Sequence, residues 1–219
     1  MIFIMELFLN VLYFILALFL PSKIRTTNIE MTRKISHMLC GSWIFIYEFI
    51  NKYYLTNIII MIFMIVLMSI SYKYNIFRSV ERANQVKSYG TVYFFVAFLV
   101  FIIYIKLYNL NSEVYIIYML PLIYGDAFAA IIGKKFNWIE YKIFNNIKSV
   151  SGNISMMLVS LLVTILYNFF ALNNYYSITY LLLISIIASI MEAISIKGTD
   201  NFTIPIFTMI IMEAMLWAK

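Results

Sequence analysis

The chain has 219 residues, of which 64% are hydrophobic and 12% are charged, and its mean hydropathy is +0.91. A water-soluble fold of this composition would have too few polar side chains to cover its surface, so we expect an all-α integral membrane protein with the bilayer as solvent. The net charge of +6 does not indicate a nucleic-acid partner, because the basic residues fall in short loops between apolar runs, as membrane topology requires.

Hydropathy predicts eight transmembrane helices, each close to the ~20 residues that a bilayer requires. The first lacks a basic stretch before it and a small-residue cleavage site after it, so we interpret it as a retained helix. The second contains Gly41, Ser42 and Glu48 and is short for a full crossing. In chain order, the predicted helices are residues 2–20, 35–50, 55–72, 91–106, 114–133, 154–172, 178–196 and 203–217.

The distribution of positive charge predicts the orientation of these helices. Thirteen of the sixteen Lys and Arg residues lie in the loops after the first, third, fifth and seventh predicted helices. Because cytoplasmic loops carry the excess of Lys and Arg, we expect those loops in the cytoplasm and both termini on the other side. No linker, repeat or low-complexity tract divides the chain, so we expect one domain over residues 1–219.

Asp126 is the clearest candidate for chemistry, because an ionisable side chain within an apolar helix is costly and marks a functional site. It lies about two turns from the cytoplasmic end of the predicted helix 114–133. Gly125, Ala129 and Gly133 recur every four residues nearby, a spacing that lets another helix pack closely. The alternative, in which Asp126 only pairs with a buried lysine, stays open.

Two further acids lie at the same predicted end of the bundle. Glu192 is near the end of helix 178–196, and Asp200 and Asn201 precede the last predicted helix. Proteins usually hold Mg²⁺ with one or two carboxylates and share it with substrate phosphates. Together with Asp126 these residues predict a Mg²⁺ site, although Asp200 and Asn201 alone could equally cap the following helix.

Basic and hydroxyl groups suited to phosphate lie on the same predicted face. Lys148, Ser149 and Gly152 come just before a helix, where hydroxyls and backbone N–H groups can bind an anion. Basic residues here could also be topology determinants or headgroup contacts, and for His37 interfacial packing is an equal alternative. Further candidates for binding phosphate are Arg33, Lys34, His37 and Arg82.

These polar residues form five motifs in a fixed order between residues 33 and 205. The motifs are Arg33-Lys34-x-x-His37-x-x-x-Gly41; Glu81-Arg82 with Tyr89-Gly90-Thr91; Gly125-Asp126-x-x-Ala129-x-x-x-Gly133-Lys134-Lys135-Phe136; Lys148-Ser149-x-x-Gly152; and Glu192-Ala193 with Asp200-Asn201-x-x-x-Pro205. In this order they resemble the CTP-dependent membrane lipid kinases, the family of phytol kinase, dolichol kinase and CTP-dependent diacylglycerol kinase. One departure is Asn137, where the resemblance leads us to expect glycine.

The resemblance implies transfer of the γ-phosphoryl group of CTP to the hydroxyl of phytol, a polyprenol, dolichol or diacylglycerol, giving a lipid phosphate and CDP. It implies Mg²⁺ held by Asp126, Asp200 and Glu192, with either aspartate able to assist deprotonation of the alcohol. The enzyme would lie in a bacterial inner membrane or the endoplasmic reticulum, surrounded by membrane lipids, with its active site facing the cytoplasm.

The resemblance also implies roles for the remaining polar residues. Ser149 and Gly152 would shape a phosphate loop, and Asn201 would orient the metal or a phosphate oxygen. His37 would bind phosphate or act as a base. Positive charge for the triphosphate would come from Arg33, Lys34, Arg82 and Lys148.

Two other functions stay open. A CDP-lipid synthase resembling phosphatidate cytidylyltransferase would need the same metal and triphosphate groups but would release pyrophosphate. A membrane transporter should distribute polar residues through the membrane depth, whereas several of the predicted helices have almost none. The sequence lacks P-loop, protein-kinase, zinc-protease and serine-hydrolase motifs, which excludes the nucleotide sites of the first two classes.

Overall fold

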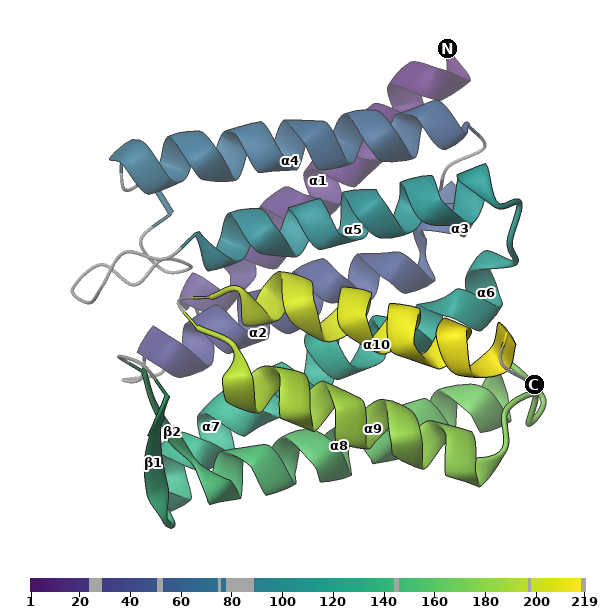
Figure 1. The fold of residues 1–219 in the computed structure, drawn as a ribbon. Coiled ribbons are helices and arrows are strands. Elements are labelled where there is room, and N and C mark those ends of the chain that lie inside the picture. The colour runs from purple at the N-terminus through teal and green to yellow at the C-terminus, as the bar shows by residue number, and fades with distance from the viewer. Residues whose placement is uncertain are drawn as a thin grey trace. The chain divides into compact units, whose positions relative to one another are not determined.

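The computed structural model describes residues 1–23, 29–50, 53–74, 76–77, 89–143, 146–196 and 198–217. These residues are helical apart from one short hairpin and the connecting turns (Figure 1), which confirms the expected all-α class. Contacts group the chain into two compact units, Met1–Leu107 and Tyr108–Lys219. Each unit is described by itself, and the single domain expected from the sequence stays a prediction.

The first unit is built from long apolar helices. Helix α1 packs against α2 and α4, and α4 packs along α5, so that aromatic side chains such as Phe14 and Phe98 are fully buried between them. The elements of this unit are α1 (Ile2–Lys23), α2 (Ile29–Gly41), the 3₁₀ turn η1 (Ser42–Phe45), α3 (Tyr47–Ile50), α4 (Tyr54–Tyr74) and α5 (Gly90–Leu107).

The prediction of one continuous helix over residues 35–50 is wrong. Helix α2 ends at Gly41, and the chain then turns through η1 before α3 begins. Glycine weakens a helix, and the turn brings Trp43 into the interior, where it is fully buried. The Trp43 Nε1 donates a hydrogen bond to Asn10 Oδ1 of α1 at 2.6 Å. The break in the helix therefore lets the indole N–H of the buried Trp43 donate a hydrogen bond.

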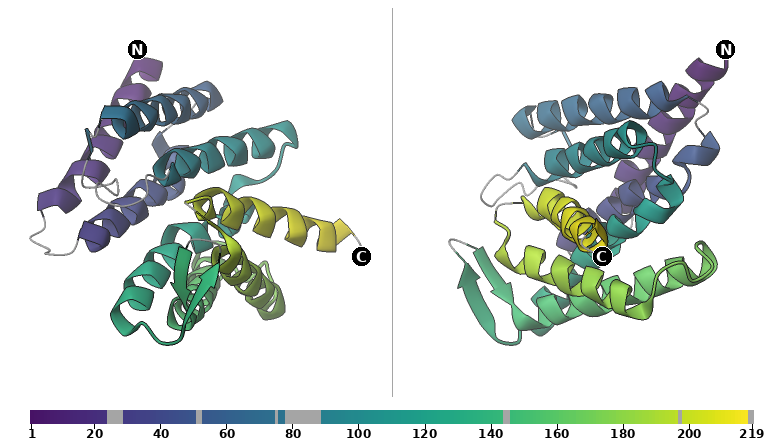
Figure 2. Two further views of the ribbon diagram at one scale, coloured as in Figure 1. Left: turned by 60° about the vertical axis from the view of Figure 1, so that its left-hand side comes forward. Right: turned by 45° about the vertical axis from the view of Figure 1, so that its right-hand side comes forward.

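The second unit contains the last three motifs of the sequence. Helix α8 packs against both α7 and α9, and α9 packs against α10; the neighbouring positions of α8 and α9 can be followed in both views of Figure 2. The elements of this unit are α6 (Ser112–Tyr115), the 3₁₀ turn η2 (Ile116–Tyr118), the π-helical turn η3 (Pro121–Gly125), α7 (Asp126–Phe136), β1 (Glu140–Ile143), β2 (Asn146–Ser149), α8 (Val150–Phe170), α9 (Ile178–Ile194) and α10 (Asp200–Trp217).

A two-stranded antiparallel hairpin, β1–β2, connects α7 to α8 where the sequence predicted only a polar loop. Helix α7 ends at Phe136, and Asn137, which caps it, has a left-handed backbone (φ 39°) and donates its N–H to the Gly133 carbonyl at 3.0 Å. Asparagine tolerates this conformation better than other residues with a side chain. Asn137 can therefore fill a position at which the resemblance led us to expect glycine.

Close packing of α7 on α8 depends on small residues, as the spacing of Gly125, Ala129 and Gly133 predicted. A Cβ on Gly133 would lie 2.8 Å from Ser149 Oγ and 3.2 Å from Gly152 Cα. A Cβ on Gly125 would lie 2.3 Å from the Ser160 hydroxyl. The packing role of these glycines is thus confirmed, because neither site has room for a larger residue without movement of its neighbour.

Within the described ranges, five segments are long and apolar enough to cross a membrane. Together with the many exposed apolar side chains, they indicate an integral membrane protein. Helix α9 is shorter, with 17 residues, and α10 includes the polar Asp200, Asn201 and Glu213. Eight crossings and the orientation of the termini stay predictions. The five segments are Ile2–Pro21, Tyr54–Tyr74, Gly90–Leu107, Ser112–Phe136 and Val150–Phe170.

We predict that Gly133→Val destabilises the protein by about 1–3 kcal/mol, because the added side chain would push α7 away from the first turn of α8. Thermal and denaturant unfolding of the full chain in detergent would measure the loss. Ala130→Val, a change of similar size at a partly exposed position of α7, is the matched control. Equal stability of the two variants would contradict the close approach of these helices.

Candidate active site

Asp126 is the first residue of α7 and is buried, with 4% of its surface exposed. It follows directly after the π-helical turn η3, and its N–H donates to the carbonyl of Pro121. Single π turns within helices occur often at functional sites, because they shift the direction of the next side chain. Asp126 therefore lies buried within the apolar segment Ser112–Phe136, and its role in chemistry stays a prediction.

The ion pair between Lys148 and Glu192 joins β2 to the end of α9. The Lys148 Nζ lies 2.8 Å from Glu192 Oε1 and also donates to the main-chain carbonyl of Glu192. Only 12% of the Lys148 side chain and 13% of the Glu192 side chain are exposed. The second carboxylate oxygen of Glu192, Oε2, is buried and has no hydrogen-bond partner within the described part of the chain.

Two further carboxylates act on Glu192 electrostatically. Asp126 and Asp200 are both close enough for their negative charges to oppose the charge on Glu192, while Lys148 favours it. The acids come from α7, α9 and α10, so the second unit brings together three acids that are far apart in sequence. Like charges at one site favour binding of a cation, because each carboxylate raises the cost of ionising the others.

Polar side chains at the starts of α8 and α10 accept hydrogen bonds from nearby backbone N–H groups. Ser149 Oγ accepts the N–H of Gly152 at 3.2 Å and thereby caps α8. Asp200 Oδ1 accepts the N–H of Asn201 at 3.0 Å, a local contact at the start of α10. Asn201 is itself buried. These contacts fix the backbone around the acids and Lys148.

The carboxylate oxygens of this site determine whether it could hold Mg²⁺. No three Asp, Glu, His or Cys side chains in the described ranges form a ready metal site. Mg²⁺ usually keeps several waters and shares substrate phosphates with one or two carboxylates. The unpartnered Oε2 of Glu192 and the adjacent acids suit that partial ligand set. The assignment of Asp126, Asp200 and Glu192 to Mg²⁺ stays a prediction.

The basic candidates on α2 belong to the first unit. Arg33 pairs with Glu30, its Nε donating to Oε2 at 3.1 Å, and Lys34 is buried, with 3% exposed. His37 is also buried, and its ring centroid lies 4.5 Å from that of Phe94 on α5. This contact agrees with the packing alternative for His37. Convergence of these residues with Asp126 stays a prediction, and Arg82 lies outside the described residues.

Three polar residues around the ion pair were missed from the sequence. Tyr141 on β1 accepts a hydrogen bond from Asn153 Nδ2 at 2.6 Å, and the Asn153 carbonyl accepts one from Ser189 Oγ at 2.9 Å. The alternation of polar and apolar residues in Glu140–Ile143, with two asparagines shortly after it at positions 145 and 146, was the signal that could have revealed the hairpin. Asn153 and Ser189 carry no comparable signal, since isolated polar residues in apolar helices are common.

A second group of polar residues in α1 was also missed. Glu6 is 1% exposed, and its Oε2 accepts a hydrogen bond from Thr56 Oγ1 of α4 at 2.7 Å. Asn10, one turn later, bonds to Trp43. The first helix therefore carries buried polar groups, contrary to the sequence-based argument against a transporter. Thr56 and Trp43 are buried in the same unit, where such bonds hold apolar helices together.

We predict that Lys148→Met lowers the free energy of unfolding by roughly 3 kcal/mol, because it leaves the buried Glu192 carboxylate without its counter-ion. Denaturation in detergent would measure this loss, with Lys142→Met on the exposed side of the same hairpin as the matched control. Combining Lys148→Met with Glu192→Gln should restore part of the stability. A loss for Lys148→Met no larger than that of the control would contradict the ion pair.

Comparison with known proteins gives information about the chain as a whole. No protein-family model matches the chain, and no solved structure matches it. A curated protein of Synechocystis sp. named phytol kinase is 27% identical over 206 residues, which cover 90% of this chain and 85% of that protein. The similarity covers most of the chain and therefore extends over parts of both units. It supports the resemblance of this chain to the CTP-dependent membrane lipid kinase family.

Proposed function

We propose that the chain is a CTP-dependent lipid-alcohol kinase. It would transfer the γ-phosphoryl group of CTP to the hydroxyl of phytol, a polyprenol, dolichol or diacylglycerol and release CDP. The observation that carries this proposal is the group of Asp126, Glu192 and Asp200 beside the buried Lys148. The similarity to a phytol kinase over most of the chain supports a kinase that acts on a lipid alcohol.

The chemistry follows from the charges of these residues. The alcohol oxygen would form a bond to the γ-phosphorus while the bond to the β-phosphate oxygen breaks and CDP leaves. Asp126 or Asp200 would accept the proton of the alcohol, a role that a carboxylate can fill in phosphoryl transfer. Bound Mg²⁺ would neutralise charge on the phosphates, and the carboxylates of Asp126, Asp200 and Glu192 would hold it.

Lys148 would supply positive charge to the phosphate chain. In the structure its ammonium group is directed to Glu192, so a bound phosphate would compete with the carboxylate for the same donor. Arg33, Lys34 and Arg82 remain candidates for additional phosphate contacts, and Asn201 for orienting a phosphate oxygen. Because the acceptor alcohol is anchored in lipid, we place the site at the cytoplasmic membrane surface, where CTP and the hydroxyl can meet.

The first test uses the purified full chain in detergent with Mg²⁺ and CTP labelled on the γ-phosphate. Phytol, a polyprenol, dolichol and diacylglycerol would be offered separately, and label would be followed into lipid. We expect transfer to at least one alcohol, and a loss of at least about 100-fold for Asp126→Asn and Asp200→Asn. Glu140→Gln, an exposed acid on the hairpin, is the control and should keep the activity.

One outcome would overturn the kinase, and another would overturn only the roles of its aspartates. Absence of transfer to every alcohol, together with CDP-lipid and pyrophosphate formed from phosphatidic acid and CTP, would identify a CDP-lipid synthase. Transfer that survives in both aspartate variants would retain the reaction but remove these residues from it.

A separate prediction concerns the metal. Removal of Mg²⁺ with a chelator should abolish transfer, and restoring Mg²⁺ should recover it, because the carboxylates would otherwise repel the triphosphate. Initial rates at fixed CTP over a range of free Mg²⁺ would measure this. An unchanged rate in the presence of excess chelator would contradict a metal-dependent mechanism.

A further inference from the structure

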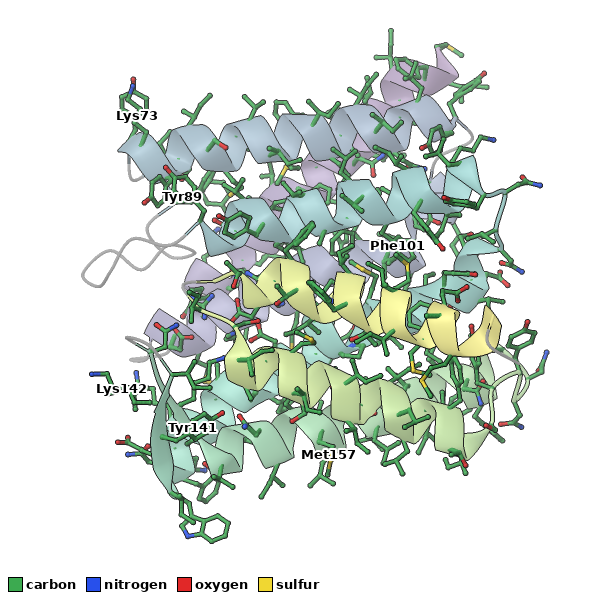
Figure 3. The ribbon with its side chains drawn as sticks, viewed as in Figure 1. Lys73, Tyr89, Phe101, Tyr141, Lys142 and Met157 are labelled. Atoms are coloured by element: carbon green, nitrogen blue, oxygen red, sulfur yellow. The ribbon has the colours of Figure 1, made fainter. Side chains whose placement is uncertain are left out.

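The hairpin places Tyr141 and Lys148 on the same face. Their Cα atoms are partners in the antiparallel register of β1 and β2, and directly opposed side chains project to the same side of a hairpin. Lys142, the next residue on β1, is exposed, and Figure 3 shows it at the outer edge of the hairpin. Tyr141 therefore accompanies Lys148 on the face that contacts the helices.

Tyr141 ties this face to two helices. Its hydroxyl oxygen accepts a hydrogen bond from Asn153 Nδ2 in the first turn of α8 at 2.6 Å. The main-chain carbonyl of Asn153 in turn accepts the Ser189 hydroxyl of α9 at 2.9 Å. Ser189 lies three residues before Glu192, which puts the two on neighbouring turns of the same side of α9. Two sets of contacts thus connect the hairpin to α9. One is the pair of hydrogen bonds through Tyr141 and Asn153, and the other is the ion pair of Lys148.

The phenol of Tyr141 also lies within the electric field of the ion pair. Burial raises the pKa of Tyr141 above its usual value, and the charges of Glu192 and Lys148 act on it in opposite directions. The hydroxyl consequently stays protonated near neutral pH. A neutral group can hold the hairpin beside the charged pair without competing with phosphate for Lys148.

We infer that Tyr141 is a positioning residue for the proposed phosphoryl transfer, holding the hairpin on α8 so that Lys148 is directed to the phosphate chain. The role of Lys148 in this inference rests on the proposed function. The role of Tyr141 in fixing the hairpin rests on its hydrogen bond to Asn153. Tyr141 itself touches no reacting group in this scheme. Its effect on the reaction should therefore pass entirely through Lys148.

The kinetic test removes one hydroxyl. Tyr141→Phe should raise the KM for CTP by about tenfold, the effect of one lost hydrogen bond, and leave kcat nearly unchanged. Asn153→Ala removes the same bond and should give the same result, whereas Tyr175→Phe, at an exposed tyrosine of the α8–α9 turn, should have no effect. In a Lys148→Met background, Tyr141→Phe should add nothing. Independent, additive effects of the two substitutions would overturn the inference.

A second measurement does not require activity. Hydrogen exchange of the full chain in detergent should be faster in peptides covering residues 138–149 of Tyr141→Phe and unchanged in Tyr175→Phe. Unchanged exchange in the hairpin of Tyr141→Phe would overturn the inference, whatever the activity. If the unaltered protein transfers phosphate to none of the alcohols, the proposed function fails by that result alone, and faster hairpin exchange would still support the hold of Tyr141.

Discussion

The ion pair between Lys148 and Glu192 determines how the candidate site is arranged, because it fixes the end of a hairpin against the end of a helix. Both side chains are largely buried, and removal of either partner would leave an uncompensated charge in an apolar surrounding. The pair also sets the balance of charge, since Asp126 and Asp200 act on the same carboxylate. With more acids than described bases around Glu192, the site favours a cation or a substrate that brings one.

Each unit contains its own buried hydrogen bonds between elements. These bonds determine which faces of its largely apolar helices pack together. In the first unit, Thr56 donates to Glu6, and Trp43 donates to Asn10. In the second, the carboxylate of Glu213 accepts hydrogen bonds from Tyr115 and Tyr118, at 3.1 Å each, near the opposite end of α10 from Asp200. In a membrane, where apolar surfaces gain little by facing each other, such bonds and close packing of small residues select how helices pair.

The sequence predicted those features that depend on local pattern. The long apolar runs predicted α4, α5 and α8 within a few residues. The four-residue spacing of Gly125, Ala129 and Gly133 indicated the close approach of another helix, which is α8 in the structure. The break after Gly41 was not predicted, because tertiary packing of Trp43 outweighed the apolar run. The hairpin was not predicted either, because the alternation of polar and apolar residues in its first strand is only four residues long. Pairing of Lys148 with Glu192, 44 residues away, depends on tertiary structure. Residues of the two units were grouped from the sequence only by the predicted membrane topology and the family resemblance.

The left-handed residue at the end of α7 has a consequence for how this kind of chain can diverge. What the turn requires at Asn137 is a backbone angle that lets the helix stop and the first strand depart, not a particular side chain. Asparagine and glycine both meet that requirement. Relatives can therefore have either asparagine or glycine at this position and keep the same backbone conformation. A sequence motif that requires glycine there would fail to match a chain with the same turn.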